Sequence, residues 1–192
     1  MKKIITLLVL IVLSANVNAQ DFKKAGNYVT IGYGLDPWGH PVLGGLGYKK
    51  SSLGPVLAFY ERGITDLVGI GRIGAGGGVG YSFYNQDYSD VWGESKYSRT
   101  RLSIILRGAY HVDFNIPSLD LYAGVGAAIH LYTDRDKVSN VFVVDSETKS
   151  SGIYAGHYVF AGVRYYFTDG FGVYAEAGHG LAALNGGLVF KF

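Results

Sequence analysis

The chain has 192 residues, a formal net charge of +2 and no cysteine, and 29 of its residues are glycine and 16 are tyrosine. The small charge leaves no basic field for a nucleic-acid partner, and the lack of cysteine excludes disulfide frameworks and thiol chemistry. Beyond the first residues no apolar run approaches the length of a membrane helix, and apolar residues instead fall at every second position.

Residues 1–19 have the pattern of a cleaved signal peptide. Two lysines precede the apolar run 4–13, which is too short to span a bilayer as a helix, and a small-x-small cleavage site ends at Ala19. We therefore expect residues 20–192 to be the mature chain and to form one domain. Removal of the two lysines lowers the formal net charge from +2 to zero.

Eight segments with a period of two residues follow, and each predicts a β-strand. They cover residues 27–35, 53–63, 67–83, 97–112, 120–132, 153–167, 171–180 and 184–192. Long polar loops are predicted at 36–52, 84–96 and 133–152, and short turns at 64–66, 113–119 and 168–170. Residues 42–49 and 140–145 could lengthen the neighbouring strands.

This alternation of long and short connections predicts an all-β fold, an eight-stranded antiparallel up-and-down transmembrane β-barrel. The long loops would be extracellular, and the short turns and both termini would be periplasmic. A soluble barrel of the lipocalin type has the same period with its apolar face inward. Three features favour the membrane barrel: glycine crowds the polar face, aromatic residues lie near the strand ends of the apolar face, and the last strand runs to Phe192.

Several motifs carry a family resemblance. They are Tyr122-Ala-Gly-Val-Gly126, Gly162-Val-Arg-Tyr-Tyr-Phe-Thr-Asp169, Gly172-Val-Tyr-Ala-Glu-Ala-Gly178 and the ending Val-Phe-Lys-Phe192. With them the mature chain resembles the small bacterial outer-membrane β-barrels of the OmpX, OmpA-barrel and OmpW type, above all the barrel proteins of Bacteroidetes. The resemblance implies a location in the outer membrane of a Gram-negative bacterium, among its lipids and lipopolysaccharide. It also implies that Phe190 and Phe192 belong to the signal that the barrel-assembly machinery reads. It implies no activity.

Charged residues in the predicted strands should point into the lumen, since a charge on the lipid face costs roughly 2–4 kcal/mol at the bilayer midplane. The predicted set is Glu61, Arg72, Arg99, Arg101, Arg107, Arg164 and Glu176. These residues either form an interior salt-bridge network that fills the barrel, or act as a selectivity ladder or anion site. The glycines of the lumen face likewise have two interpretations: tyrosine or arginine side chains lie across them, or they leave a small cavity.

His157 and His179 should face lipid as a diagonal pair near the outer rim. Outer-membrane lipid A deacylases use a lipid-facing histidine with a serine and an acidic partner, but neither partner is in place here. We therefore predict no catalytic residue, no metal site and no cofactor.

The preferred functional hypothesis is a structural or interaction protein that contacts an envelope partner through loops 36–52, 84–96 and 133–152. A narrow channel or transporter for small molecules is the alternative. A lipid-modifying enzyme of the outer leaflet comes third.

Overall fold

The computed structural model describes residues 22–35, 48–90, 93–114, 116, 118–140 and 143–192. The predicted signal peptide, and residues 36–47 of the first predicted loop, lie outside the described residues. The strands are β1 (Asn27–Leu35), β2 (Tyr48–Gly63), β3 (Gly71–Asp90), β4 (Gly93–Val112), β5 (Leu119–Asn140), β6 (Val143–Tyr166), β7 (Phe171–His179) and β8 (Leu184–Lys191). Among the described residues there is no helix that is long and apolar enough to cross a membrane.

The eight strands form a closed antiparallel barrel in which every strand pairs with its sequence neighbours and β1 pairs with β8. Closure places Thr30 opposite Val189, and the backbone of Asn27 exchanges hydrogen bonds with that of Phe192. The fold class predicted from the alternating pattern is therefore confirmed. Full closure leaves no free strand edge within the barrel, which removes the main aggregation hazard of a β-sheet.

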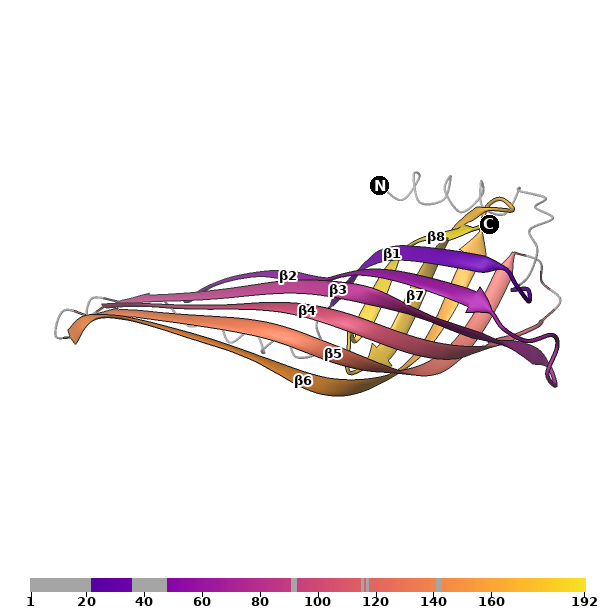
Figure 1. The fold of residues 1–192 in the computed structure, drawn as a ribbon. Coiled ribbons are helices and arrows are strands. Elements are labelled where there is room, and N and C mark those ends of the chain that lie inside the picture. Colours follow the sequence, from indigo (N-terminus) through magenta and orange to yellow (C-terminus); the bar gives the residue numbers. More distant parts are fainter. Residues whose placement is uncertain (1–21, 36–47, 91–92, 115, 117, 141–142) are drawn as a thin grey trace, which may run out of the picture.

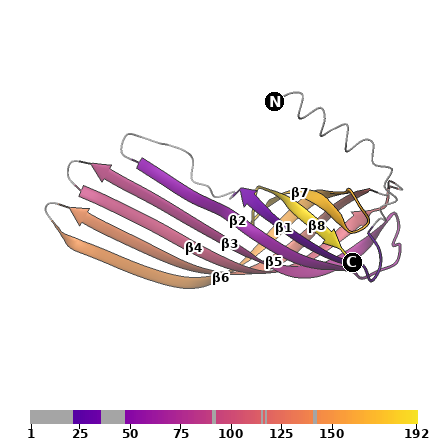
Figure 2. The same ribbon diagram turned by 90° about the horizontal axis from the view of Figure 1, so that it is seen from above.

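Strands β2 to β6 run far past β1, β7 and β8 and form a flat tongue beyond one end of the barrel (Figures 1 and 2). We call this part the sheet extension; it comprises residues 48–53, 83–90, 93–100, 133–140 and 143–151. The prediction of long loops at 84–96 and 133–152 was therefore wrong, since most of these residues continue the strands. Over 93–100 and 133–137 most side chains are polar on both faces, so the apolar alternation fades, although the ladder between β3 and β4 continues without interruption from Gly71↔Val112 to Asp90↔Gly93.

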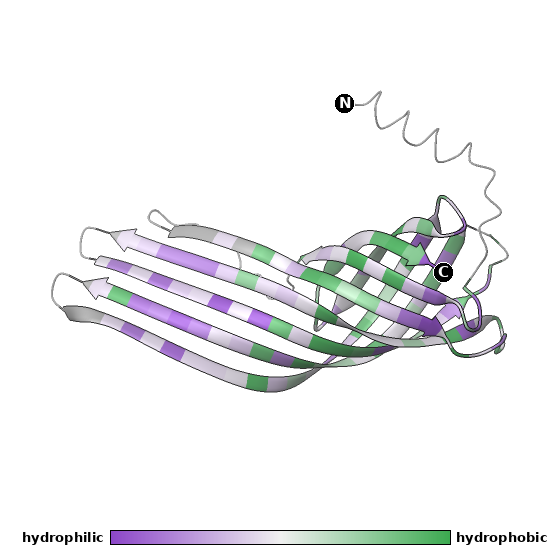
Figure 3. Ribbon diagram, turned by 45° about the horizontal axis from the view of Figure 1, so that its top comes forward, coloured by the Kyte–Doolittle hydropathy of each residue, from purple (hydrophilic) through white to green (hydrophobic). Residues whose placement is uncertain are grey.

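The two faces of the barrel wall have opposite character. Arg107 and Glu176 are buried in the interior, whereas Leu106, Val125 and Ile153 point outward with 69%, 64% and 71% of their surface exposed. Figure 3 shows the apolar residues concentrated on the barrel and the polar residues on the sheet extension. The alternative of a soluble barrel with an apolar interior is therefore overturned. A soluble monomer rarely exposes so extensive an apolar surface.

Tyrosine rings cover the glycines of the lumen face. A Cβ atom on Gly162 would lie 2.6 Å from Cζ of Tyr122, and one on Gly126 would collide with the ring of Tyr158. At both positions the structure therefore shows a tyrosine ring lying across the glycine, and not a small cavity. Glycine is needed there because the ring occupies the space of a side chain.

We expect Gly126→Ala to destabilise the barrel by roughly 1–3 kcal/mol, because an added methyl group would force the Tyr158 ring out of its position. Gly108→Ala, on the outward face of the adjacent strand β4, is the control, since the nearest atom to its Cβ would be 3.8 Å away. The urea dependence of folding in lipid vesicles measures both variants. Equal midpoints for the two would contradict this account.

Candidate functional site: the lumen and the sheet extension

Six ionisable side chains from five strands meet in the lumen, and we call them the lumen charge cluster. They are Glu61, Arg107, His111, Asp120, Arg164 and Glu176, and all are buried. Arg164 lies 2.7 Å from Glu61 and 3.4 Å from Asp120, and Arg107 lies 2.8 Å from Glu176. Tyr122 donates a hydrogen bond of 2.8 Å to Glu176. Charges buried this deeply are stable only when each has partners.

His111 balances the charge of the cluster. Its Nε2 lies 2.6 Å from Oε1 of Glu61, and its Nδ1 lies 2.8 Å from Oδ1 of Asp120. When both carboxyl groups are ionised they can only accept, so both contacts are hydrogen bonds only if the ring is an imidazolium that donates from both nitrogens. Three carboxylates then face two guanidinium groups and one imidazolium, which makes the cluster neutral.

Aromatic rings fill the remaining space around the cluster. The guanidinium of Arg107 lies 4.1 Å from the ring centre of Phe160, and that of Arg164 lies 4.6 Å from the ring centre of Tyr122. Phe22, which precedes β1, stacks on His111 with 3.6 Å between ring centres and an angle of 4° between planes. The lumen is therefore packed with side chains at the level of the cluster, as expected for a barrel of eight strands.

Only four of the seven charged residues predicted to face the lumen belong to this cluster: Glu61, Arg107, Arg164 and Glu176. Arg72 forms a separate ion pair of 2.9 Å with Asp113, near the end of the barrel opposite the sheet extension. Arg101 and Arg99 lie toward the other end, at ladder positions opposite Tyr132 and Asp134. Sequence reasoning missed the other two members, His111 and Asp120. The signal for Asp120 was its parity, because Asp120 shares the inward face with Tyr122.

The inner face of the sheet extension continues the lumen wall and is rich in tyrosine. We call this surface the tyrosine face; it includes Tyr84, Tyr97, Arg99 and Asp134 on the sheet extension, and Tyr132 and Tyr154 on the adjoining part of the barrel. Arg99 binds Asp134 through two hydrogen bonds of 2.7 Å each. The Arg99 guanidinium also lies 5.8 Å from the ring centre of Tyr97 and 5.6 Å from that of Tyr132. These contacts hold planar polar groups among the rings without burying them.

The bond with Arg99 lowers the pKa of Asp134 below its ordinary value of 3.8. Because the pKa of Asp134 is lowered in the folded protein, the ion pair stabilises the fold at pH values above 3.8. This stabilisation is lost as the pH falls through the pKa that Asp134 has in the folded state. We expect Arg99→Gln to raise the titration midpoint of the Asp134 carboxyl, measured by its ¹³C chemical shift. Arg135→Gln, on the opposite face of the same strand, should leave it unchanged. An equal midpoint in wild type and Arg99→Gln would contradict the assigned cause.

The two predicted lipid-facing histidines do point outward, and His179 is paired with Val159 in the ladder. The ladder neighbour of His157 on β5 is Ala127. Neither of these two ladder neighbours has a side chain that can serve as a nucleophile or orient an imidazole ring.

A hydroxyl–imidazole contact that sequence reasoning missed lies in the barrel wall, where Ser103 and His130 approach to 2.8 Å. Both residues are buried, and Tyr154 stacks on the imidazole at 4.6 Å. The ladder neighbours of His130 are Ser103 and Tyr154, and neither supplies the carboxylate that would orient a catalytic base. We interpret the contact as a hydrogen bond by which two buried polar side chains satisfy each other. No group of His, Cys, Asp and Glu among the described residues is arranged to hold a metal ion.

Aromatic rings gather on the outer surface at the end of the barrel opposite the sheet extension. Phe190 lies 5.4 Å from Phe171, which lies 6.1 Å from Phe167, and Phe167 lies 5.6 Å from Tyr165. Phe192 is exposed at the end of the same face as Phe190. This is the position of an interfacial aromatic girdle in a membrane barrel.

Fold and site together define a closed eight-stranded barrel with an apolar exterior, an ion-paired interior and a polar sheet extension. Among solved structures, the N-terminal β-barrel domain of Pseudomonas aeruginosa OprF is similar, with 16% identity, a TM-score of 0.38 and coverage of 88% of this chain and 98% of that one. Ail, the attachment invasion locus protein of Yersinia pestis, is similar with 13% identity, a TM-score of 0.39 and coverage of 88% and 100%. No family model matches the chain, and no curated protein matches it.

Proposed function

We propose that this chain is an integral outer-membrane barrel that acts as an interaction protein through its sheet extension. The apolar exterior supports membrane insertion, because outward side chains such as Leu106 and Val125 lie where a bilayer would cover them. The sheet extension would then stand outside the cell, and the short connections and both termini would lie in the periplasm. Phe190 and Phe192 would serve in assembly, and lipopolysaccharide would surround the barrel.

The packed lumen argues against transport. A solute would have to pass the lumen charge cluster, in which Arg107, Arg164 and Glu61 are each at most 5% exposed and bonded to one another or to neighbours. Opening such a path would separate buried ion pairs, at a cost of several kcal/mol for each charge left without a partner. The cluster is accordingly interpreted as a structural filling of the barrel and the narrow channel is disfavoured.

In this proposal the tyrosine face is the surface that binds the partner. Tyrosine and arginine are the residue types that dominate binding hot spots, because they combine large contact area with hydrogen bonding. Here they stand on a hydrogen-bonded ladder, and the two bonds between Arg99 and Asp134 hold the arginine in a defined position. Preorganisation of this kind lowers the entropic cost of binding.

A two-part experiment tests the proposal. Planar-bilayer recordings of the refolded protein should show a folded but silent barrel; discrete, reproducible channels would overturn the interaction role in favour of transport. Cells that display the wild-type chain should adhere to at least one member of an immobilised panel of envelope proteins, extracellular matrix proteins and polysaccharides. Cells that display the variant Tyr97→Ser/Arg99→Ser should not.

The control variant is Ser98→Ala/Thr100→Ala, which changes the opposite face of the same strand. It should adhere like the wild type. Equal adhesion of the tyrosine-face variant and the control, or no adhesion of the wild type to any member of the panel, would count against the proposed role.

A further inference from the structure

A continuous series of planar groups crosses the tyrosine face from β3 to β6. Each of these strands contributes one tyrosine, in the order Tyr84, Tyr97, Tyr132 and Tyr154. The ring centres of Tyr84 and Tyr97 are 6.2 Å apart, and those of Tyr132 and Tyr154 are 5.9 Å apart. The guanidinium of Arg99 joins the two pairs, since it lies 5.8 Å from the ring centre of Tyr97 and 5.6 Å from that of Tyr132. We call these five side chains the aromatic track.

The rings of the track are open to solvent on part of their surface. Tyr154 is 43% exposed, and the other three tyrosines are half-buried. Tyr132 lies across the bare backbone of Gly152, because a Cβ atom there would be 2.6 Å from the Tyr132 hydroxyl and 2.7 Å from its Cζ. A ring that rests on a glycine in this way turns its other face away from the sheet. The track therefore offers planar groups at intervals of 5.6 to 6.2 Å.

The composition of the surface around the track differs from that of a protein-binding surface. Between the ladder row of Tyr97 and that of His130, the inward side chains of β3 to β6 are tyrosine, histidine, arginine, aspartate, serine, threonine or glutamine, apart from glycine. None of them is aliphatic. The centre of a protein–protein interface is mostly apolar, with ~65% non-polar area. The rings of the track are therefore better matched to a partner that combines flat apolar patches with a polar edge.

The charges in the same area cancel. Arg99 is paired with Asp134 through two hydrogen bonds of 2.7 Å, and the other charged residues in these rows are Arg101 and Asp136. Nucleic acids and other polyanions bind to surfaces with a net positive charge. Two arginines and two aspartates supply no net charge, so this surface favours an uncharged ligand.

An uncharged sugar ring has the chemistry that these groups recognise. One side of a pyranose ring is lined by C–H groups whose hydrogens carry a small positive charge, and the face of a tyrosine ring is negative. The hydroxyls around the edge of the sugar need donors and acceptors. The phenol hydroxyls supply both, and the Arg99–Asp134 pair adds N–H groups and carboxylate lone pairs that its own two bonds leave over. Successive sugars of a linear glycan can then lie on successive planar groups of the track.

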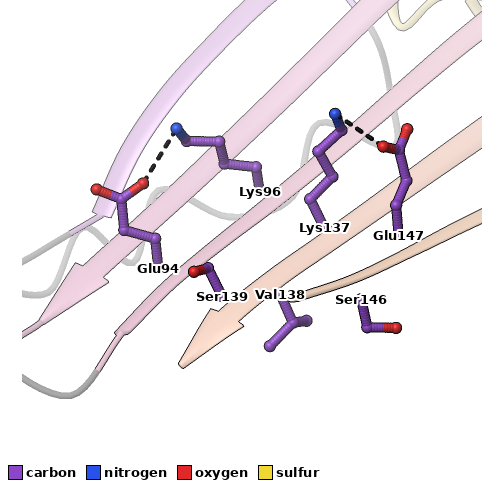
Figure 4. Close-up of a pocket in the computed structure, with 7 residues that line it drawn as sticks. All are labelled: Glu94, Lys96, Lys137, Val138, Ser139, Ser146 and Glu147. Atoms are coloured by element: carbon purple, nitrogen blue, oxygen red, sulfur yellow. Dashed lines mark ion pairs between the residues drawn. The ribbon is translucent and has the colours of Figure 1, made fainter. Parts of the chain in front are cut away.

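A hollow near the tip of the sheet extension lacks these features. It has a volume of about 360 Å³ and is lined mainly by charged and small side chains (Figure 4). Lys96 lies 3.1 Å from Glu94 there, and Lys137 lies 2.9 Å from Glu147. The charges thus satisfy each other, and none of the described residues that line the hollow has a ring on which a sugar could stack.

We propose that the tyrosine face binds an uncharged glycan chain whose sugar rings stack on the aromatic track. The open ring faces, the absence of aliphatic side chains and the balanced charges all support this occupant over a protein or a polyanion. The inference rests on the proposed function, in which the tyrosine face is the binding surface, and it names the chemical class of the partner.

The test uses the full mature protein, folded in a detergent that has no sugar headgroup, on an array of linear oligosaccharides. The array carries uncharged glucans, mannans and galactans, together with sulfated forms of the same chains. These chains carry no lipid, so insertion of a lipid tail cannot account for binding. The wild type should bind at least one uncharged chain, and raising the salt from about 50 to about 200 mM should change this binding by less than about twofold.

Two variants of one residue separate ring stacking from other contributions. Tyr132→Leu should weaken binding by about tenfold or more, because leucine keeps the apolar bulk but has no aromatic face. Tyr132→Phe keeps the ring and should stay within about threefold of the wild type. Tyr81→Leu is the matched control, since Tyr81 is 44% exposed on the outer face of β3, and it should bind like the wild type. A heat-modifiable gel shift reports the folding of each variant.

Three results would overturn the inference. They are no binding of any uncharged chain by the folded wild type, equal binding by Tyr132→Leu and Tyr132→Phe, and binding that is confined to the sulfated chains and falls steeply with salt. The adhesion assay separates this failure from that of the proposed function. Adhesion to an immobilised protein without binding to the array would leave the interaction role standing and remove the glycan, whereas the absence of both would remove both.

Discussion

Replacing Arg164 with Met is expected to destabilise the barrel by about 3–5 kcal/mol, which is the usual cost of removing one partner from a buried ion pair. Arg164 is 1% exposed and is bonded to both Glu61 and Asp120. Without it, three carboxylates would face one guanidinium and His111. The cluster would hold a net negative charge in a low-dielectric interior, where the cost of an uncompensated charge is highest.

Refolding yield in lipid vesicles, followed by the heat-modifiable gel shift, measures this effect. Arg135→Met, on the exposed sheet extension, is the control and should refold like the wild type. The double variant Glu61→Leu/Arg164→Met should regain part of the lost yield, because it removes one charge of each sign and leaves the cluster neutral. A double variant that refolds worse than Arg164→Met alone would contradict the charge-balance account.

The barrel itself could be predicted because its two physical requirements leave a repeating pattern in the sequence. A lipid-facing residue must be apolar and its neighbour must fit a narrow lumen, so the pairs Ile104–Ile105 and Leu106–Arg107 follow the pleat of β4. The bounds of β1 agree with the predicted residues 27–35 because polar or turn-forming residues flank the apolar alternation. Strand number, strand direction and the facing of the residues all follow from this pattern.

The length of β3 to β6 could not be predicted in the same way. Outside a membrane neither face of a sheet has to be apolar, so the stretch from Tyr84 to Lys96 has none of the alternation that marks a strand. Residues 84–90 and 93–96 still form a ladder, because backbone pairing started in the barrel continues into the next residues at little additional entropic cost. A weaker signal exists in hindsight: Tyr84, Tyr88 and Tyr97 keep the parity of the inward positions.

The composition of the lumen charge cluster was also only partly predictable. The inward parity of Arg107 and Glu176 is visible in the sequence, but their contact joins residues 69 positions apart and depends on the three-dimensional closure of the barrel. Asp120 lies at the start of β5, next to a predicted turn, where a polar residue needs no special explanation. Only the fold shows that its carboxylate faces His111 and Arg164.

Placing an arginine on the outer wall is the second large effect, and it tests membrane insertion directly. Leu106 is 69% exposed near the middle of the apolar part of β4. In water, Leu106→Arg would replace an exposed apolar side chain with a charged one and would leave stability nearly unchanged. In a bilayer the same change should cost roughly 2–4 kcal/mol, because a guanidinium near the midplane has no water to solvate it.

The denaturant midpoint of folding into lipid vesicles measures this cost, and Ser98→Arg is the matched control. Ser98 lies on the same strand and the same face but eight positions farther along, beyond the apolar residues, so an arginine there should be tolerated. A fall in the midpoint for Leu106→Arg alone would mean that the apolar wall is covered by hydrocarbon and that the sheet extension stands clear of it. Equal midpoints for the two variants would mean that the exposed apolar wall is not in contact with lipid, and the proposed location would have to be given up.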